Sequence, residues 1–196
     1  MNNLLYHVDA FTSEPFRGNP AGVFISSGVL TEEFMQTMAA ELNLSETAFL
    51  TPQDGGFRIR FFTPETEIDL CGHATLSAAH ILYENELAQK EAAIRFFSKA
   101  GELVTAYNNG LIIMDFPVYK LEKEEISDDL KKASGLKATE LFHCDYDWYL
   151  ARLGSEKEII DASPDFGKLK KSRFRNLIIT AASEKENIDF IVRCFV

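Results

Sequence analysis

Side chains that can bind or transfer protons alternate along the segment TPETEIDLCGHATLSAAHIL, which spans residues 63–82. They are Glu65, Glu67, Asp69, Cys71 and His73. The segment then continues into small and apolar residues, a pattern typical of a helix that is buried on several sides. The first turn of a buried helix has backbone N–H groups that bulk water cannot reach, and such groups attract a carboxylate or a phosphate. We therefore expect an anion-binding site where this helix begins.

The residues at the helix start can be assigned individual roles. We expect Gly72, His73 and Ala74 to bind a substrate carboxylate, because a glycine lets a ligand approach the backbone closely. The imidazole of His73 would assist proton movement. Asp69 would either orient His73 or cap the helix.

The remaining residues of this alternating pattern are Cys71, Glu65 and Glu67. A thiol near a helix N-terminus has a lowered pKa, so a functional Cys71 and an inert buried Cys71 both stay open. Glu65 and Glu67 are expected to be solvated and to keep a strand edge soluble. The inward residues from Asp69 to His73 would then supply the site.

Two further segments place polar residues where functional side chains are often found. Glu46 ends LNLSE, between a predicted helix and a predicted strand. A glutamate in such a place is more often a solvated turn residue. In RGNPAGV, Asn19 and Pro20 follow Gly18, and either turn chemistry alone or ligand contact would explain them.

The first half of the chain predicts strands around two helices. Thr31 would cap a helix with an apolar face of Phe34, Met38 and Leu42, ending near Asn43. Strands are expected at 4–11, 22–25, 47–50 and 57–62, and in the segments AAIRFF, ELVTAY and GLIIMDF, the last two joined by an Asn-Asn-Gly hairpin turn at 108–110.

The second helix, expected at 75–87, is apolar around most of its girth. A helix of this kind among many strands predicts a sheet wrapped around a central helix. No long polar linker interrupts this half of the chain.

The second half predicts another α+β unit, beginning near residue 119. The acidic segment KLEKEEISDDLKK would be a surface connection, and a helix is expected at 126–134. Further strands are expected near 140–144, 148–153, 177–181 and 188–196. The chain ends within the apolar segment DFIVRCFV, without a counterpart of the buried helix. We therefore expect this sequence to lack the C-terminal part of the second unit.

Composition excludes several classes of protein. A net charge of −10, with 30 acidic residues against 20 basic ones, argues against a nucleic-acid partner. No segment approaches a membrane span or a signal peptide, so no membrane partner and a cytoplasmic location are expected. The three cysteines are widely spaced without a Cys-x-x-Cys pair, which favours reduced thiols over a disulfide framework or a zinc site. Neither a metal cluster nor a glycine-rich phosphate loop is evident, so no cofactor is expected.

Four segments together resemble one family. VDAFTSEPFRGNPAGVF (8–24), LNLSETAFL (42–50), RFFTPETEIDLCGHATLSAA (60–79) and MDFP (114–117) closely resemble the PhzF family of phenazine biosynthesis-like proteins, related to diaminopimelate epimerase. The resemblance covers the first half and is diffuse beyond residue 118. It implies two pseudo-symmetric α+β domains, each a curved mixed sheet around a central helix, with the active site in the cleft between them. Here these would be residues 1–118 and an incomplete 119–196, since the family's acidic Gly-x-x-Glu-Asp-Pro-Val-Thr-Gly-Ser motif is missing.

The resemblance also implies roles for individual residues. In the PhzF pattern the residue at Glu46 transfers the proton, while a thiol at the position of Cys71 is a base in the related epimerases. Asn19 also matches the pattern. The catalytic candidates are thus Glu46, His73, Asp69 and Cys71.

The expected activity is that of a cofactor-independent isomerase or epimerase acting on a small carboxylate-bearing metabolite, with a homodimer as a possible assembly. A non-catalytic PhzF-like binding protein and an epimerase based on Cys71 are the alternatives. As a 196-residue fragment the chain could also be inactive.

Overall fold

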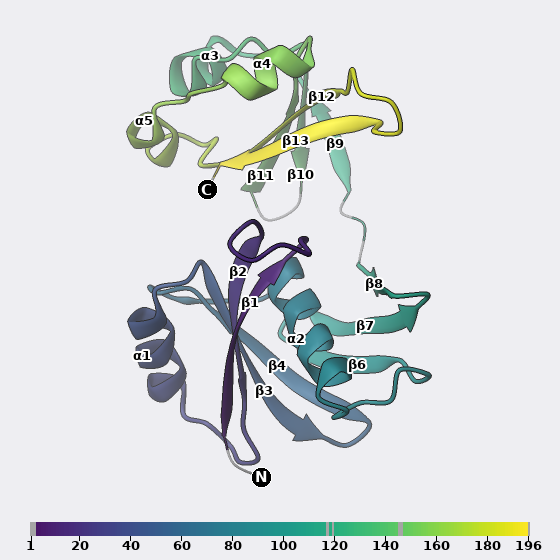
Figure 1. Cartoon of the computed structure of the whole chain (residues 1–196). Helices are drawn as coiled ribbons and strands as arrows, with labels where there is room; N and C mark the ends of the chain where they lie inside the picture. Colours follow the sequence, from purple (N-terminus) through teal and green to yellow (C-terminus); the bar gives the residue numbers. More distant parts are fainter. Residues whose placement is uncertain (1–2, 117, 119, 145–146, 196) are drawn as a thin grey trace. The chain divides into compact units, whose positions relative to one another are not determined.

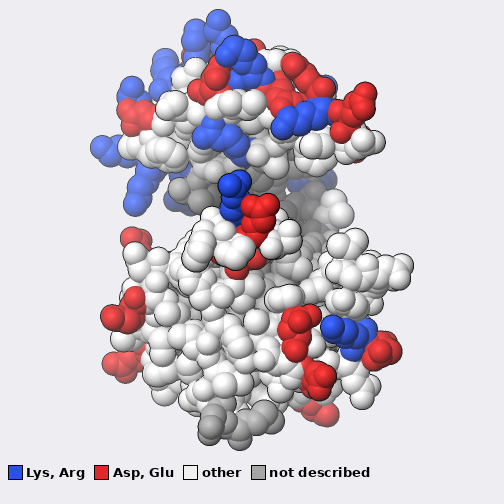
Figure 2. Space-filling view, viewed as in Figure 1, with Lys and Arg blue, Asp and Glu red and all other residues white. Residues whose placement is uncertain are grey.

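The structure is a computed structural model that describes residues 3–116, 118, 120–144 and 147–195 (Figure 1 and Figure 2). The chain divides into two compact units, Met1–Phe116 and Pro117–Val196, and each contains one mixed β-sheet (Figure 1). Three positions named in the sequence analysis lie outside the described residues: the end of the MDFP motif at 117, the domain start at 119 and the last strand residue at 196. No helix in the described ranges is long and apolar enough to cross a membrane.

The sheet of the first unit has the strand order β1-β2-β3-β4-β6-β7-β8, with β5 paired to β4. The pairs β2–β3 and β4–β6 are parallel, and a helix lies between the two strands of each pair in the sequence. The elements are β1 (Leu4–Ala10), β2 (Asn19–Ile25), α1 (Glu32–Leu42), β3 (Glu46–Gln53), β4 (Gly56–Phe62), β5 (Glu67–Ile68), α2 (Gly72–Glu84), β6 (Ile94–Ser98), β7 (Gly101–Asn108) and β8 (Leu111–Asp115).

Helix α2 lies inside the curl of this sheet (Figure 1). It contacts β1 and β8, which are the two edge strands, as well as β2 and β3. One helix can contact both edges only if the sheet curves around it. The small residues Ala74, Ala78 and Ala79 are fully buried, and their size lets the helix approach the strands closely. The predicted sheet around a central helix is therefore confirmed for this unit.

Helix α1 covers the opposite face of the same sheet. Successive strand side chains point to opposite faces, so Val23 joins the core around α2 while its neighbour Phe24 joins a second core with α1. The predicted apolar face of α1 is confirmed in part, because Met38 packs against this second core and the ring of Phe34 contacts Phe24, although the buried positions are Met35 and Ala39. Both faces of β2 are thus covered, which explains its continuous apolar sequence.

Short sequence signals predicted the start of α1 and the hairpin turn of this unit. Thr31 caps α1 by accepting a hydrogen bond from the N–H of Phe34 at 3.2 Å, as predicted. Asn109 and Gly110 join β7 to β8 with φ angles of 49° and 84°, as the predicted hairpin requires. Helix α2 begins at Gly72, the helix start that the sequence analysis named, and ends at Glu84, three residues before the predicted end at 87.

Glu67 is not the solvated residue that the sequence analysis expected. Only 8% of its side chain is exposed, and it accepts hydrogen bonds from Arg60 at 2.6 and 2.7 Å and a third from Lys99. Arg60 also donates to Glu32 at 2.7 Å. The prediction failed because cations on neighbouring segments neutralise a carboxylate that the strand turns inward. Glu65 is exposed, as expected.

The sheet of the second unit has the order β13-β12-β11-β10-β9, with β11 and β12 parallel. Its elements are β9 (Leu121–Glu124), α3 (Asp128–Ser134), β10 (Glu140–Cys144), β11 (Trp148–Arg152), α4 (Glu156–Asp161), α5 (Phe166–Lys170), β12 (Asn176–Ala182) and β13 (Phe190–Phe195). The predicted surface connection after residue 118 was partly wrong, since part of it pairs with β10 as the edge strand β9. The short helices α4 and α5 were not predicted.

The helices of this unit cover one face of its sheet. Strand residues such as Leu141, Tyr149 and Ile179 form a core with Leu130 of α3 and Ile159 of α4. The alternate residues of the central strands lie on the other face, where they line an open groove. Its lining includes Leu150, Arg152, Ile178, Thr180, Phe190 and Val192.

Replacing the buried carboxylate tests the ion cluster of the first unit. Glu67→Gln should lower the free energy of unfolding at pH 7 by about 1–3 kcal/mol, because an amide cannot replace the charged bonds to Arg60. Arg60 holds the pKa of Glu67 below its ordinary value of 4.5. Such a carboxyl stabilises the fold above its unfolded-state pKa, and the contribution is lost as the pH falls through the folded-state pKa. Urea unfolding at pH 7 and pH 3 measures both effects.

Glu65→Gln is the matched control, because this neighbouring carboxylate is exposed. The difference between wild type and Glu67→Gln should shrink at pH 3, whereas Glu65→Gln should stay close to wild type at both pH values. Equal stability of all three proteins at pH 7 would contradict the role given to Glu67.

Candidate active site

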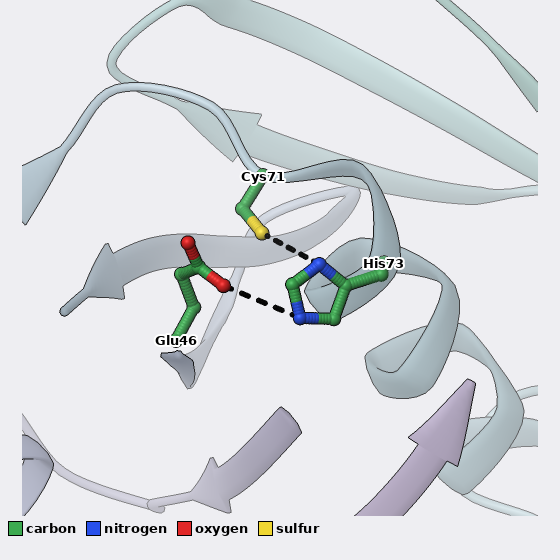
Figure 3. A group of neighbouring side chains, drawn as sticks. All are labelled: Glu46, Cys71 and His73. Carbon is green, nitrogen blue, oxygen red and sulfur yellow. Dashed lines mark hydrogen bonds and ion pairs between the residues drawn. The ribbon is translucent and has the colours of Figure 1, made fainter. Parts of the chain in front are cut away.

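Three side chains from two segments of the first unit, the start of β3 and the start of α2, converge (Figure 3). The carboxylate of Glu46 lies 3.3 Å from Nε2 of His73. The sulfur of Cys71 lies 3.4 Å from Nδ1 of the same ring. The structure thus brings together three of the four residues that the sequence analysis selected as catalytic candidates.

The secondary structure places each of these groups at the end of an element. Glu46 is the first residue of β3 and lies beside Ala21 of the parallel strand β2. Cys71 is the N-cap of α2, and His73 is the second residue of the helix. Hydroxyl groups fix this first turn, because Thr75 donates to the carbonyl of Cys71 at 2.7 Å and Ser77 to that of His73 at 2.8 Å. The site residues therefore stand on rigid elements.

The thiol of Cys71 is buried and protonated at neutral pH. Its exposed fraction is 7%. Burial, together with the nearby charge of Glu46, raises the pKa of Cys71 to about 12, although the N–H groups of Ala74 and His73 act in the opposite direction. The lowered pKa that a helix N-terminus alone would produce is therefore outweighed by desolvation.

Two acceptors at Nε2 of His73, Ser45 and Glu46, indicate which ring nitrogen carries the proton. Its hydroxyl donates to the carbonyl of Pro20 at 3.3 Å, so its oxygen is left to accept from Nε2 of His73 at 3.4 Å. Glu46 also faces Nε2 as an acceptor. We assign the proton to Nε2 on these contacts, and Nδ1 then accepts from the Cys71 thiol. The sequence analysis missed Ser45, although it directly precedes Glu46.

The start of α2 is partly covered at Gly72 and His73 and buried at Ala74. No side-chain hydrogen bond caps the helix. A Cβ atom built on Gly72 would lie 3.6 Å from Cζ of Phe116, which is ordinary van der Waals contact. The fold itself therefore does not require a glycine at this position. The side chain of Ala74 is fully buried, so only its backbone could contact a ligand.

The RGNP segment lies beside the site through its backbone. Pro20 accepts the hydrogen bond from Ser45, and the strand register places Asn19 two residues before the partner of Glu46. The side chain of Asn19 is exposed. A Cβ atom on Gly18 would lie 2.4 Å from the carbonyl oxygen of Ala10, so this glycine is needed for packing. Asn19 is the first residue of β2 and pairs with Ala10, so turn chemistry does not account for it, and ligand contact stays a prediction.

Asp69 does not join the other candidates. The strand β5 ends at Ile68, and the side chain of Asp69 is exposed. The expectation that it caps α2 was wrong, because Cys71 is the N-cap and no side chain caps the helix. Among the described residues, the side-chain partners of the His73 ring are Ser45, Glu46 and Cys71, so these residues orient it instead.

The three converging groups also form a set that could hold a metal ion. One ligand atom each from Glu46, Cys71 and His73 lie within 4.8 Å of one another. The sequence analysis saw no metal cluster, because Glu46 is remote from the other two residues in the sequence. Only the fold brings the set together.

The chain is similar to known proteins over nearly its whole length. A family model described as PhzC-PhzF, phenazine biosynthesis-like protein, matches residues 8–196. An uncharacterized isomerase of Halalkalibacterium halodurans is 39% identical over 196 residues, which cover 100% of this chain and 74% of that protein.

Solved structures extend this similarity to the fold. A PhzF-family phenazine biosynthesis protein of Enterococcus faecalis is 36% identical, with a TM-score of 0.87 over 97% of this chain and 72% of that one. A probable proline racemase of Agrobacterium radiobacter, solved with bound carbonate, has a TM-score of 0.65 at 9% identity over 97% of this chain and 69% of that chain, which shows a shared fold alone. The predicted fold class is confirmed.

Thiol labelling tests the buried state of Cys71. With a pKa raised to about 12, less than about one Cys71 in a thousand is ionised at pH 8, and the thiolate is the reactive form. Iodoacetamide should therefore alkylate Cys71 far more slowly than Cys194, which is exposed. Mass spectrometry of the digested protein measures both rates. Labelling of Cys71 as fast as Cys194 in the folded protein would show that the thiol is accessible and ionised.

Proposed function

The chain belongs to the phenazine biosynthesis-like PhzC-PhzF family, and from this premise we propose that it is a cofactor-independent isomerase. The proposed reaction moves a proton on a carbon atom of a small carboxylate-bearing molecule. Glu46 is the proposed general acid and base, and the start of α2 is the proposed binding site for the substrate carboxylate. Isomerase names among its relatives support the class of reaction.

The observation that carries the proposal is the contact between Glu46 and His73, 3.3 Å apart at the start of α2. A general base must lie within hydrogen-bond reach of the proton that it removes. One oxygen of Glu46 faces His73, and the other has no contact within the group drawn in Figure 3. The carboxylate, of which 20% is exposed, can therefore keep its bond to the ring while its second oxygen meets a substrate.

The same geometry favours Glu46 over Cys71 as the proton carrier. A base must be able to lose its proton near the working pH. The raised pKa of Cys71, about 12, keeps this thiol protonated at neutral pH. We therefore assign Cys71 to the support of His73, where its S–H group can donate to Nδ1.

The helix start is the proposed anchor for the substrate carboxylate. The first N–H groups of a helix have no partner within it, and the helix dipole favours an anion there. Two features support this assignment: α2 has no side-chain cap, and Gly72 has no side chain that would block a ligand. An anion so placed would lie close to His73 and hence to the carboxylate of Glu46.

Replacing Glu46 tests its role as proton carrier. Glu46→Gln keeps the shape of the side chain and removes the proton acceptor, so exchange of substrate hydrogen with solvent deuterium should fall at least about 100-fold. Proton NMR in D₂O, with a panel of α-amino acids and small unsaturated acids, measures the loss of the exchanging C–H signal.

Two variants complete this test. Glu41→Gln replaces an exposed carboxylate on α1 and should exchange at the wild-type rate. Cys71→Ser should retain measurable exchange. Undiminished exchange in Glu46→Gln together with its loss in Cys71→Ser would transfer the role to the thiol, and a wild-type protein that binds panel compounds without exchange would favour a non-catalytic binding protein.

Gly72→Ala separates binding from folding. Because an added Cβ meets only ordinary contact with Phe116, the stability should stay the same or rise by up to about 1 kcal/mol. Binding of the exchanging acid should weaken at least about tenfold, since the methyl group blocks its approach to the helix start. Urea unfolding and NMR titration measure the two effects. Gly28→Ala, at an open position, is the control, and wild-type affinity in Gly72→Ala would place the carboxylate elsewhere.

A further inference from the structure

We propose that Cys71, His73 and Glu46 form a binding site for a thiophilic divalent cation of the Zn²⁺ type. The three side chains offer one thiolate, one imidazole nitrogen and one carboxylate, which are the ligand types that zinc accepts in proteins. Their ligand atoms lie within 4.8 Å of one another. No other such group of three is found among the residues that the structure describes.

The distance between Cys71 and His73 matches tetrahedral zinc coordination. With Zn–S near 2.3 Å and Zn–N near 2.0–2.1 Å, the sulfur and nitrogen ligands of a tetrahedral ion lie about 3.6 Å apart. The sulfur of Cys71 and Nδ1 of His73 are 3.4 Å apart. An ion can therefore bind to both Sγ of Cys71 and Nδ1 of His73 if these atoms move apart by a few tenths of an ångström.

Glu46 supplies the third ligand by a movement of its side chain. Its carboxylate faces Nε2 rather than Nδ1, so it must turn toward the sulfur to reach the ion (Figure 3). The glutamate side chain is longer than that of cysteine and is 20% exposed, whereas Cys71 is held at the helix N-cap. The exposed side of Glu46 also gives the ion a route from solvent. A fourth position is left for water, as in open zinc sites.

Binding replaces one proton by the ion. The S–H bond of Cys71 breaks, the proton leaves to the buffer and a Zn–S bond forms, without any transfer of electrons. The thiolate and carboxylate balance the two positive charges of the ion, which a helix N-terminus would otherwise repel. The mixed sulfur, nitrogen and oxygen set favours Zn²⁺ or Co²⁺ over Mg²⁺ or Ca²⁺, which prefer oxygen ligands.

The ion would inhibit rather than assist the proposed reaction. It would occupy the carboxylate of Glu46, so that this group could no longer accept a proton. This consequence rests on the proposed function. The binding site itself does not, because it depends only on the three ligands and their spacing.

Spectroscopy with Co²⁺ tests the site without any measurement of turnover. Addition of Co²⁺ to the untagged, reduced protein should produce a thiolate-to-metal charge-transfer band in the near ultraviolet, saturating at one equivalent. Zn²⁺ should abolish the band by competition. Cys194→Ser, which removes an exposed cysteine elsewhere, should behave as wild type.

Substitutions of the ligand residues should affect the charge-transfer band and the binding affinity differently. Cys71→Ser should lose the band and bind at least about 100-fold more weakly, since even the loss of an outer-shell partner can cost that much; serine is also a good helix N-cap, so the fold is kept. Glu46→Gln should keep the band but bind at least about tenfold more weakly.

Four results would overturn the proposal. Three concern the charge-transfer band: its absence in the wild-type protein, its survival in Cys71→Ser and its disappearance in Cys194→Ser. Glu46→Gln with wild-type affinity would remove Glu46 from the ligand set and so overturn the site as described. A failure of the isomerase proposal would leave all of these measurements unaffected, because none of them involves substrate.

Discussion

The burial of α2 inside the first sheet is the constraint on which the rest of this unit depends. The helix contacts both edge strands, so the sheet must curve. The small residues of the helix let the strands approach it closely. Burial also affects the chemistry at the helix start, because Cys71 and Ala74 are buried while Gly72 and His73 are only partly covered. Cys71, buried at that point, keeps its proton for the same reason. Fold and candidate site thus share one physical cause.

Much of this could be predicted from the sequence, because the signals are local. An all-round apolar helix predicts the curved sheet, and the hairpin at Asn109 and Gly110 follows from residues that tolerate positive φ. Glu67 was mispredicted because its partners, Arg60 and Lys99, come from other segments. The edge strand β9 was missed because its residues are mostly polar. Tertiary partners, which no local pattern encodes, account for these failures.

The candidate site, too, could be predicted only in part from local sequence patterns. The positions of Glu46 and His73 at element ends could be anticipated, but the ring nitrogen of His73 that carries the proton could not. It follows from the two acceptors at Nε2, which are the carboxylate of Glu46 and the hydroxyl oxygen of Ser45, whose own proton is used by the carbonyl of Pro20. Asp69, the closest carboxylate to His73 in the sequence, takes no part because the chain turns its side chain outward after β5. For the carboxylates, proximity to His73 along the chain was therefore a poor guide to proximity in space, whereas Cys71 is close to it in both.

The close approach of Gly18 to the carbonyl of Ala10 affects how sequence variation in this region should be interpreted. No side chain with a Cβ atom fits at position 18 unless the backbone moves. Intolerance of substitution there would report on packing and says nothing about ligand contact, even though the neighbouring Pro20 is linked to the site through Ser45. Asn19, the residue after Gly18 and the first of β2, has an exposed side chain that meets no such barrier, so mutational intolerance there would carry information about a bound molecule.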